Sequence, residues 1–125
     1  MLFDADVIIW DFRGNPNAAD AITMDADRMM SVVTYMELLQ GARDKQELRG
    51  IMELLTFGGF RIVPLSENIG HRASIYMEEY CLKSGLEMPD ALVAATAVEN
   101  GLHLCTTNWK HFSVISELQI ERVRP

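Results

Sequence analysis

Strand-length apolar runs alternate with longer helix-like segments along nearly the whole chain, and this alternation restricts the possible folds more than any other feature. The strand-like runs are 1–3, 29–33, 60–65, 102–107 and 119–125, and the last is expected at a sheet edge. Strands that alternate with helices predict an α/β fold with a mainly parallel sheet. The chain of 125 residues, 49% of them hydrophobic, suits a single domain over 1–125.

Helix signals fill the intervals between these runs. Helices are expected over 5–12, 34–43, 44–59, 66–85 and 88–101. Glu37 falls in the first turn of the second predicted helix. The last predicted helix is apolar nearly all round, which predicts that it is buried. Asn15-Pro16 is expected to form a turn, and 108–112 a loop or a short turn.

Four polar residues lie at predicted strand ends or helix starts, namely Asp4, Glu37, Asp90 and Asn108. In a right-handed parallel sheet the carboxyl ends of the strands and the amino ends of the following helices share one edge, where such folds bind ligands. We therefore expect these residues to converge. Clustered carboxylates repel one another unless a cation lies among them, and Mg²⁺ or Mn²⁺ takes carboxylate oxygens.

Each of these residues also has an ordinary structural explanation. Glu37 with Thr34 fits a capping box, in which the Glu side chain reaches back to an open backbone N–H. Asp90 can complement a helix dipole, and Asn108 is a common turn former. Asp6 is interpreted first as a solvated acid in the first turn of its helix.

Composition limits the class of protein. The net charge of −7 gives no general basic surface for nucleic acid, although a divalent cation would supply positive charge inside an acidic cleft. Cys81 and Cys105 lack the paired spacing of a zinc site and are expected to be buried free thiols. No apolar run approaches the length of a membrane span and the start does not resemble a secretion signal, so a cytoplasmic location is expected.

Three stretches together resemble a known family: "LFDADVII", "VVTYMELLQGA" and "PDALVAATAVENGLHLCTTN". They are similar to PIN-domain ribonucleases, and the small size of the chain resembles the VapC-type toxins of bacterial toxin–antitoxin pairs. The resemblance implies a three-layer α/β/α sandwich. It also implies an Mg²⁺- or Mn²⁺-dependent endoribonuclease that hydrolyses phosphodiester bonds in RNA. The implied partners are an RNA substrate, a cognate antitoxin with a basic tail, and a second copy of the chain in a homodimer.

The resemblance also assigns roles to individual residues. Asp4, Glu37 and Asp90 match the three acidic metal-binding and catalytic positions, and Asn108 a fourth metal position. The accessory positions are Asp6, Thr34, Thr106 and His111. Two residues depart from the family pattern: Thr107 stands where a basic residue is common, and His111 stands where an Asp is common. An imidazole at a second metal position would favour Mn²⁺ over Mg²⁺, because Mg²⁺ prefers oxygen ligands.

Three alternatives remain open at this stage. The first is a degenerate, non-catalytic PIN-like binding module. The second is a two-component receiver domain, which needs an Asp at the end of a central strand, whereas no Asp lies between Asp44 and Asp90. The third is a phosphatase similar to the haloacid dehalogenases, suggested by "DADV", although the lysine and the later acidic pair of that class have no matching residues here.

Overall fold

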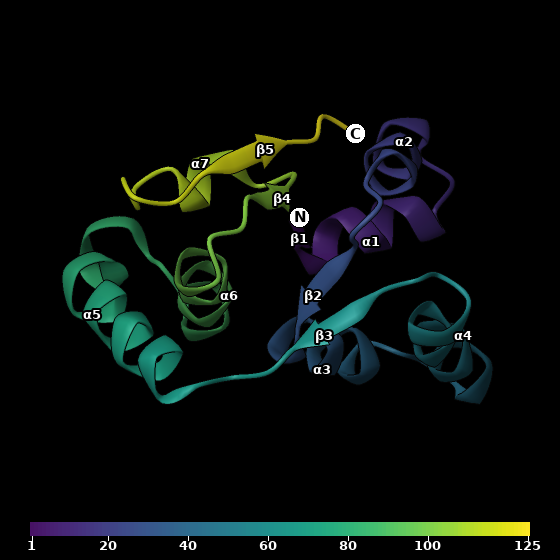
Figure 1. Ribbon diagram of the computed structural model, residues 1–125, viewed down its shortest axis with the longest axis horizontal. Helices are drawn as coiled ribbons and strands as arrows, with labels where there is room; N and C mark the ends of the chain where they lie inside the picture. Colours follow the sequence, from purple (N-terminus) through teal and green to yellow (C-terminus); the bar gives the residue numbers. More distant parts are fainter.

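Five short strands form one fully parallel sheet in the computed structural model, which describes residues 1–125. The strands are β1 (Leu2–Phe3), β2 (Met29–Ser31), β3 (Arg61–Val63), β4 (Leu104–Thr106) and β5 (Ile120–Arg122). Their order across the sheet is β3-β2-β1-β4-β5 (Figure 1). The predicted α/β class, the parallel sheet and the final edge strand are confirmed. Because β1 and β4 are neighbours, residues that follow these two strands meet at one edge.

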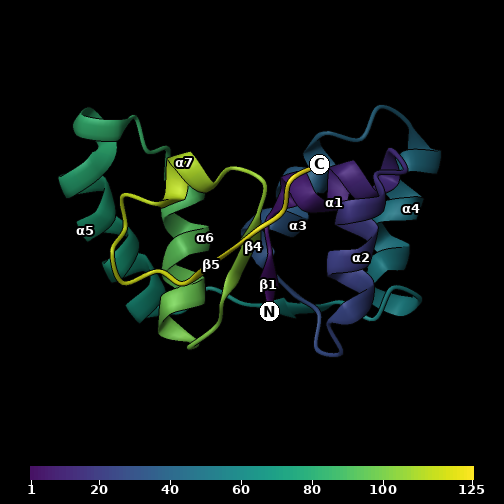
Figure 2. The ribbon, with the colours of Figure 1, turned by 90° about the horizontal axis from the view of Figure 1, so that it is seen from above.

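Helices cover both faces of the sheet. They are α1 (Ala5–Phe12), α2 (Pro16–Met24), α3 (Val32–Gln40), α4 (Lys45–Thr56), α5 (Glu67–Ser84), α6 (Met88–Glu99) and α7 (Trp109–Phe112). Figure 2 shows α5, α6 and α7 on one side of the central strands, and α1, α2 and α4 on the other. The resulting three-layer α/β/α arrangement is the one that the resemblance implied.

The hydrophobic residues form two separate cores, one on each face of the sheet. Leu2 and Leu104 pack with α5, α6 and α7, whereas the residues next to them, Phe3 and Cys105, pack with α1, α2 and α4. Successive side chains of a strand point to opposite faces, so each of the strands β1 to β4 contributes to both cores. Helix α6 is buried as predicted, and its alanines allow α5 to pack closely against it.

The helix after β2 begins earlier than the sequence predicts. Strand β2 ends at Ser31, whose Oγ accepts a hydrogen bond of 3.1 Å from the backbone N–H of Val33 and caps α3. Glu37 therefore lies in the second turn of α3, not the first. The capping box of Thr34 and Glu37 is wrong, because Ser31 occupies the capping position. The β-branched Val32 and Val33 favoured a longer strand by propensity, but the serine cap stops it.

Three further expectations need correction. Residues 16–24 form α2 and not a plain turn, because Asn15 caps the helix and Pro16 takes its first position. Residues 109–112 form the short helix α7 rather than a loop. Cys105 is buried but Cys81 is only partly so, since it lies on the outer helix α5, and both thiols are free. None of the helices combines the length and the apolar character that a membrane span requires.

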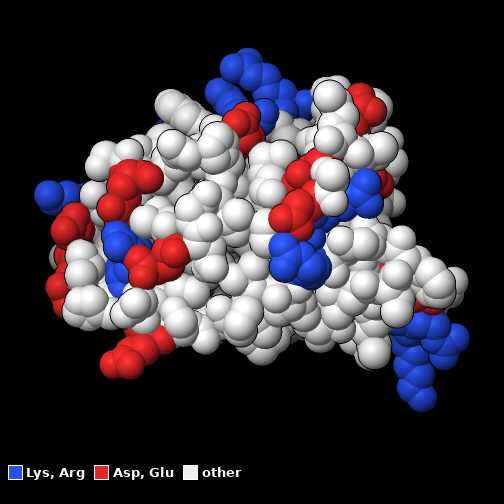
Figure 3. All heavy atoms as spheres, viewed as in Figure 1, with Lys and Arg blue, Asp and Glu red and all other residues white.

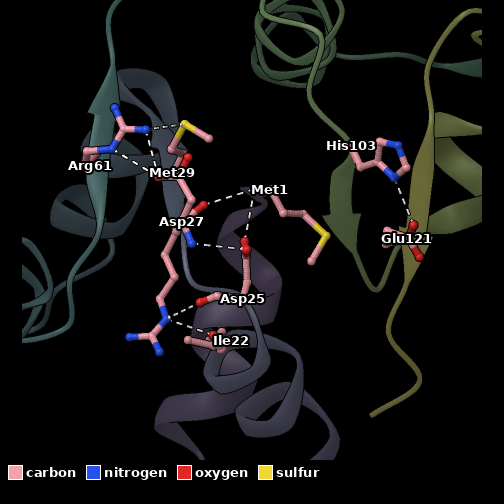
Figure 4. Close-up of polar contacts among 9 residues, drawn as sticks. Met1, Ile22, Asp25, Asp27, Met29, Arg61, His103 and Glu121 are labelled. Atoms are coloured by element: carbon pink, nitrogen blue, oxygen red, sulfur yellow. Dashed lines mark hydrogen bonds and ion pairs between the residues drawn. The ribbon is translucent and has the colours of Figure 1, made fainter.

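The amino-terminal edge of the sheet is closed by polar contacts (Figure 4). Arg61 of β3 donates to Asp27 at 2.8 Å, and the His103 ring lies 2.9 Å from Glu121 of β5. Arg28 Nε donates to the carbonyl oxygens of Ile22 and Asp25 at 2.8 and 3.1 Å. These contacts satisfy polar groups at the edge opposite the acidic residues described below.

Two glycines of α5 provide a matched test of this backbone. Gly85 ends the helix at φ 68°, and Gly70 lies within the helix, with open space around each Cβ position. Gly85→Ala should lower the free energy of unfolding by about 1 kcal/mol, because an L side chain is strained at positive φ. Gly70→Ala should raise it by about 0.5–1 kcal/mol. Urea denaturation measures both; equal effects would contradict the left-handed end of α5.

Candidate active site

Asp4 is held at the carboxyl edge of the sheet by its own helix and by the neighbouring strand. It directly follows β1 and caps α1, and its Oδ1 accepts a hydrogen bond of 2.9 Å from the backbone N–H of Ala5. Its Oδ2 accepts one of 2.9 Å from the hydroxyl of Thr106, the last residue of β4. Thr106 Oγ1 also accepts from the backbone N–H of Asn108 at 3.0 Å. The pairing of β1 with β4 thus fixes the carboxylate of Asp4.

Asp6 lies beside Asp4 and is not the solvated acid expected from the sequence. The Thr107 hydroxyl donates to its Oδ2, and its Oδ1 is buried without a hydrogen-bond partner. The expectation failed because the residues after β4 cover the first turn of α1. Thr107, a departure from the family pattern, is therefore the partner of this second carboxylate. The strand order that brings Thr107 to Asp6 is not visible in the sequence periodicity.

Asp90 and His111 meet across two helices. Asp90 lies in the first turn of α6, and His111 Nε2 of α7 lies 2.9 Å from its Oδ2. Both side chains are about three-quarters buried. The short helix α7 turns the imidazole toward the acidic edge.

Glu37 approaches the same edge from α3. Glu37 is exposed at the surface, whereas Thr34, one helical turn before it, is fully buried with an unpartnered hydroxyl. Asn108 is exposed, and its side chain makes no hydrogen bond to the acidic residues or to the start of α7. The structure thus brings Asp4, Glu37 and Asp90 to one edge, together with Asp6, and Asn108 follows β4 at this edge without a side-chain hydrogen bond to them.

Burial and neighbouring carboxylates raise the pKa of Asp4 and of Glu37, and burial raises that of Asp90. Burial raises the pKa of Asp4 well above its ordinary value, and the charges of Asp6 and Asp90 raise it further, against the hydrogen bond from Thr106. Burial and then the charges of Asp90 and Asp6 raise the pKa of Glu37. Burial also raises the pKa of Asp90, and the His111 contact offsets part of that rise. Four acidic groups therefore share one partly dehydrated region.

This donor set fits a hard divalent cation in its chemistry. Its ligand atoms are carboxylate oxygens, their mutual repulsion would be relieved by positive charge, and Asp6 Oδ1 is buried without a partner. No three acidic, histidine or cysteine side chains lie close enough to hold an ion between them. Asp4 is instead engaged by Thr106, and Asp90 by His111.

Comparisons with known proteins identify the family of this chain. The sequence profile of the PIN domain family matches residues 1–118. The chain therefore belongs to the PIN domain family. Ribonuclease VapC10 from Mycobacterium tuberculosis is 35% identical over 123 residues, covering 95% of this chain and 90% of that protein. The receiver-domain and phosphatase alternatives do not survive this assignment.

Solved structures show the same fold. A toxin–antitoxin complex from Klebsiella pneumoniae is 29% identical with a TM-score of 0.77, covering 94% of this chain and 93% of that one. VapBC-1 from nontypeable Haemophilus influenzae is 27% identical with a TM-score of 0.79, and the match covers 97% of this chain and 96% of that one. VapBC2 from Rickettsia felis is 17% identical with a TM-score of 0.79, covering 98% of both chains, and shows the fold alone.

The raised pKa of Asp4 predicts a specific pH dependence of stability. A carboxyl group whose pKa is higher in the folded state stabilises the fold while protonated, below its unfolded pKa, and loses that contribution as pH rises through the folded pKa. In chelator at pH 7.5, Asp4→Asn should therefore raise Tm by about 4 °C, the shift that about 1 kcal/mol brings in a small domain. The difference in Tm between Asp4→Asn and the parent protein should become smaller toward pH 4. Thermal denaturation measures it, and a variant less stable than the parent at pH 7.5 would contradict the repulsion.

Proposed function

We propose that this chain is a divalent-metal-dependent endoribonuclease and the toxin of a bacterial toxin–antitoxin pair. The observation that carries the proposal is the gathering of Asp4, Glu37 and Asp90 at the carboxyl edge of the sheet, where each has a raised pKa. Membership in the PIN domain family and similarity to a protein named Ribonuclease VapC10 support the same reaction.

The residues of the proposed site have different roles. Asp4, Glu37 and Asp90 would hold Mg²⁺ or Mn²⁺, with the Asn108 amide oxygen as a further ligand. The bound cation would neutralise charge on the phosphoryl oxygens and lower the pKa of a water molecule. Thr106 orients Asp4 through its hydroxyl. Glu37 or Asp90 would orient the attacking water or accept its proton.

A cognate antitoxin is the proposed protein partner, because the similar solved structures include toxin–antitoxin complexes. A groove of about 860 Å³ runs beside Glu37 between α1, α3 and α4, with Ile9, Phe12 and Ile51 among its apolar lining. An antitoxin segment with apolar residues would fill this groove, and a basic residue of its tail would then pair with the carboxylates. We also propose a homodimer, the state that the family resemblance implies.

One observation favours a second candidate function. No three acidic or histidine side chains lie close enough to hold an ion between them, as expected if the chain were a non-catalytic PIN-like binding module. Titration calorimetry with Mg²⁺ and Mn²⁺ distinguishes the two, because such a module need not bind the cation.

Substitution of the acidic residues tests the proposed reaction. Asp4→Asn and Asp90→Asn should each reduce metal-dependent RNA cleavage by more than about 100-fold, the upper limit usually seen for groups that only support a metal ligand. Each change removes a ligand charge and keeps the shape. Asp20→Asn, an exposed acid on α2, is the control and should cleave normally. Initial rates on RNA in Mg²⁺ and in Mn²⁺ measure the effect; a normal rate for either site variant would remove that residue from the site.

The groove yields a separate prediction about the partner. Phe12→Glu should weaken binding to the product of the adjacent antitoxin gene by at least about 10-fold, because it places a charge among apolar groove residues. Phe57→Glu is the control, since Phe57 is exposed but lies outside the groove. Calorimetry with the purified antitoxin measures both, and light scattering gives the mass of the free chain. If Phe12→Glu and Phe57→Glu bind the antitoxin with equal affinity, the groove is excluded as its binding site. A monomeric mass for the free chain would exclude the homodimer.

A further inference from the structure

Trp109 is an exposed aromatic residue at the border of the acidic edge. It is the first residue of α7, directly after Asn108, and its side chain remains 44% exposed. The other residues of this short helix are used differently: Phe112 is buried in the core, and His111 contacts Asp90. A single exposed apolar residue is ordinary on a protein surface, but this indole presents aromatic surface to solvent directly beside the acidic edge, where a ligand can reach it.

Arg122 stacks on the Trp109 ring. Its guanidinium carbon lies 5.5 Å from the ring centroid, within the range of a cation–π contact. Arg122 ends the edge strand β5, where it is paired in register with Thr106, the residue that binds Asp4. The stacked pair therefore lies one strand away from the centre of the carboxylate cluster.

The cations near Trp109 are not neutralised within the protein. Lys110, Arg122 and Arg124 make no ion pair, and their side chains make no hydrogen bond, whereas Arg43, Arg61 and Arg72 are all paired with carboxylates. Figure 3 shows Lys and Arg side chains projecting at the top of the molecule over β5 and the C-terminus. In a chain with a net charge of −7, these cations provide the positive charge that a phosphodiester backbone needs next to the acidic edge.

We propose that Trp109 and Arg122 form a binding subsite for single-stranded RNA, in which a base stacks on the indole and Arg122 pairs with a neighbouring phosphate. The inference rests on the proposed ribonuclease function and names how its substrate is held. Stacking on an aromatic side chain tolerates any base, because every base has a flat π face. The subsite would thus position the strand across the carboxylates without reading its sequence. Trp109 is a positioning residue here and not a catalytic one.

Fluorescence tests the contact without any need for cleavage. The chain has two tryptophans, so Trp10→Phe leaves Trp109 as the single emitter, and Trp109→Phe leaves Trp10 as the matched control. Trp10 also contacts an arginine, Arg13, at 5.6 Å. Both are combined with Asp4→Asn to prevent turnover and titrated with a ten-residue oligoadenylate. We expect saturable quenching of Trp109 and none of Trp10. A ten-residue abasic ribose-phosphate strand, which offers charge without bases, should leave Trp109 unquenched.

Kinetics with otherwise unmodified protein test the consequence for the substrate. Trp109→Ala should raise KM for RNA at least about 5-fold, the low end of the loss of one stacked base, with kcat changed less than about 2-fold. Trp109→Phe should restore most of the affinity, because it retains an aromatic face. Arg122→Gln should flatten the dependence of log affinity on log salt by about 0.7, as expected for one lost phosphate contact to a single strand.

The outcomes separate this inference from the proposed function. If the parent cleaves RNA, Trp109→Ala has a normal KM and oligoadenylate does not quench Trp109, the stacking subsite is wrong and the ribonuclease stands. If the parent does not cleave but Trp109 is quenched, the ribonuclease is wrong and the subsite stands. If Trp109→Ala changes the mass by light scattering and leaves KM unchanged, Trp109 belongs to a protein interface, and the inference is overturned.

Discussion

The confinement of like charges at one edge of a parallel sheet is the constraint on which the rest of this structure depends. Asp4 follows β1 and has little access to water, with Asp6 and Asp90 close enough to raise its pKa. Burial of an unpaired carboxylate is costly, so neighbouring groups must satisfy it. Thr106 donates to Asp4, Thr107 donates to one oxygen of Asp6, and His111 lies 2.9 Å from Asp90; all three residues come from the segment that contains β4 and α7.

The segment after β4 therefore links the stability of the fold to the chemistry of the site. Thr106 and Thr107 donate to the carboxylates of Asp4 and Asp6 at the start of α1, and His111 meets Asp90 at the start of α6, on the opposite face of the sheet from α1. Trp109, in the same segment, is exposed to solvent and stacks against Arg122. Acidic groups that suit a cation and free cations that suit phosphate, which are far apart in the sequence, are thus separated by a single strand of the sheet.

The proposed reaction and the proposed partner use the same electrostatic asymmetry. Phosphate oxygens require positive charge beside the carboxylates, which a divalent cation and Arg122 would supply from different sides. A basic antitoxin tail would satisfy the carboxylates directly and so compete with the cation for them. Glu37 is common to both proposed sites, since it belongs to the acidic edge and also lines the apolar groove.

Much of the fold was predictable because local rules act over short distances. The helix expected over 66–85 is α5, which Ser66 caps and Gly85 ends, and the helix expected to be buried because of its apolar character is α6. Local rules failed where two of them competed, as at Val32 and Val33, where the cap from Ser31 overcame the preference of valine for strands.

The sequence by itself determined that strands and helices alternate and that Asp4, Glu37 and Asp90 lie where such elements meet. The tertiary structure alone decided which partners these acids have, because the strand order β3-β2-β1-β4-β5 brings Thr106 and Thr107 to residues about a hundred positions earlier. It also decided that one carboxylate oxygen of Asp6 is buried and that Trp109 stacks with Arg122. Periodicity reports which face of an element is apolar, whereas the choice of neighbouring strand depends on the packing of the whole sheet.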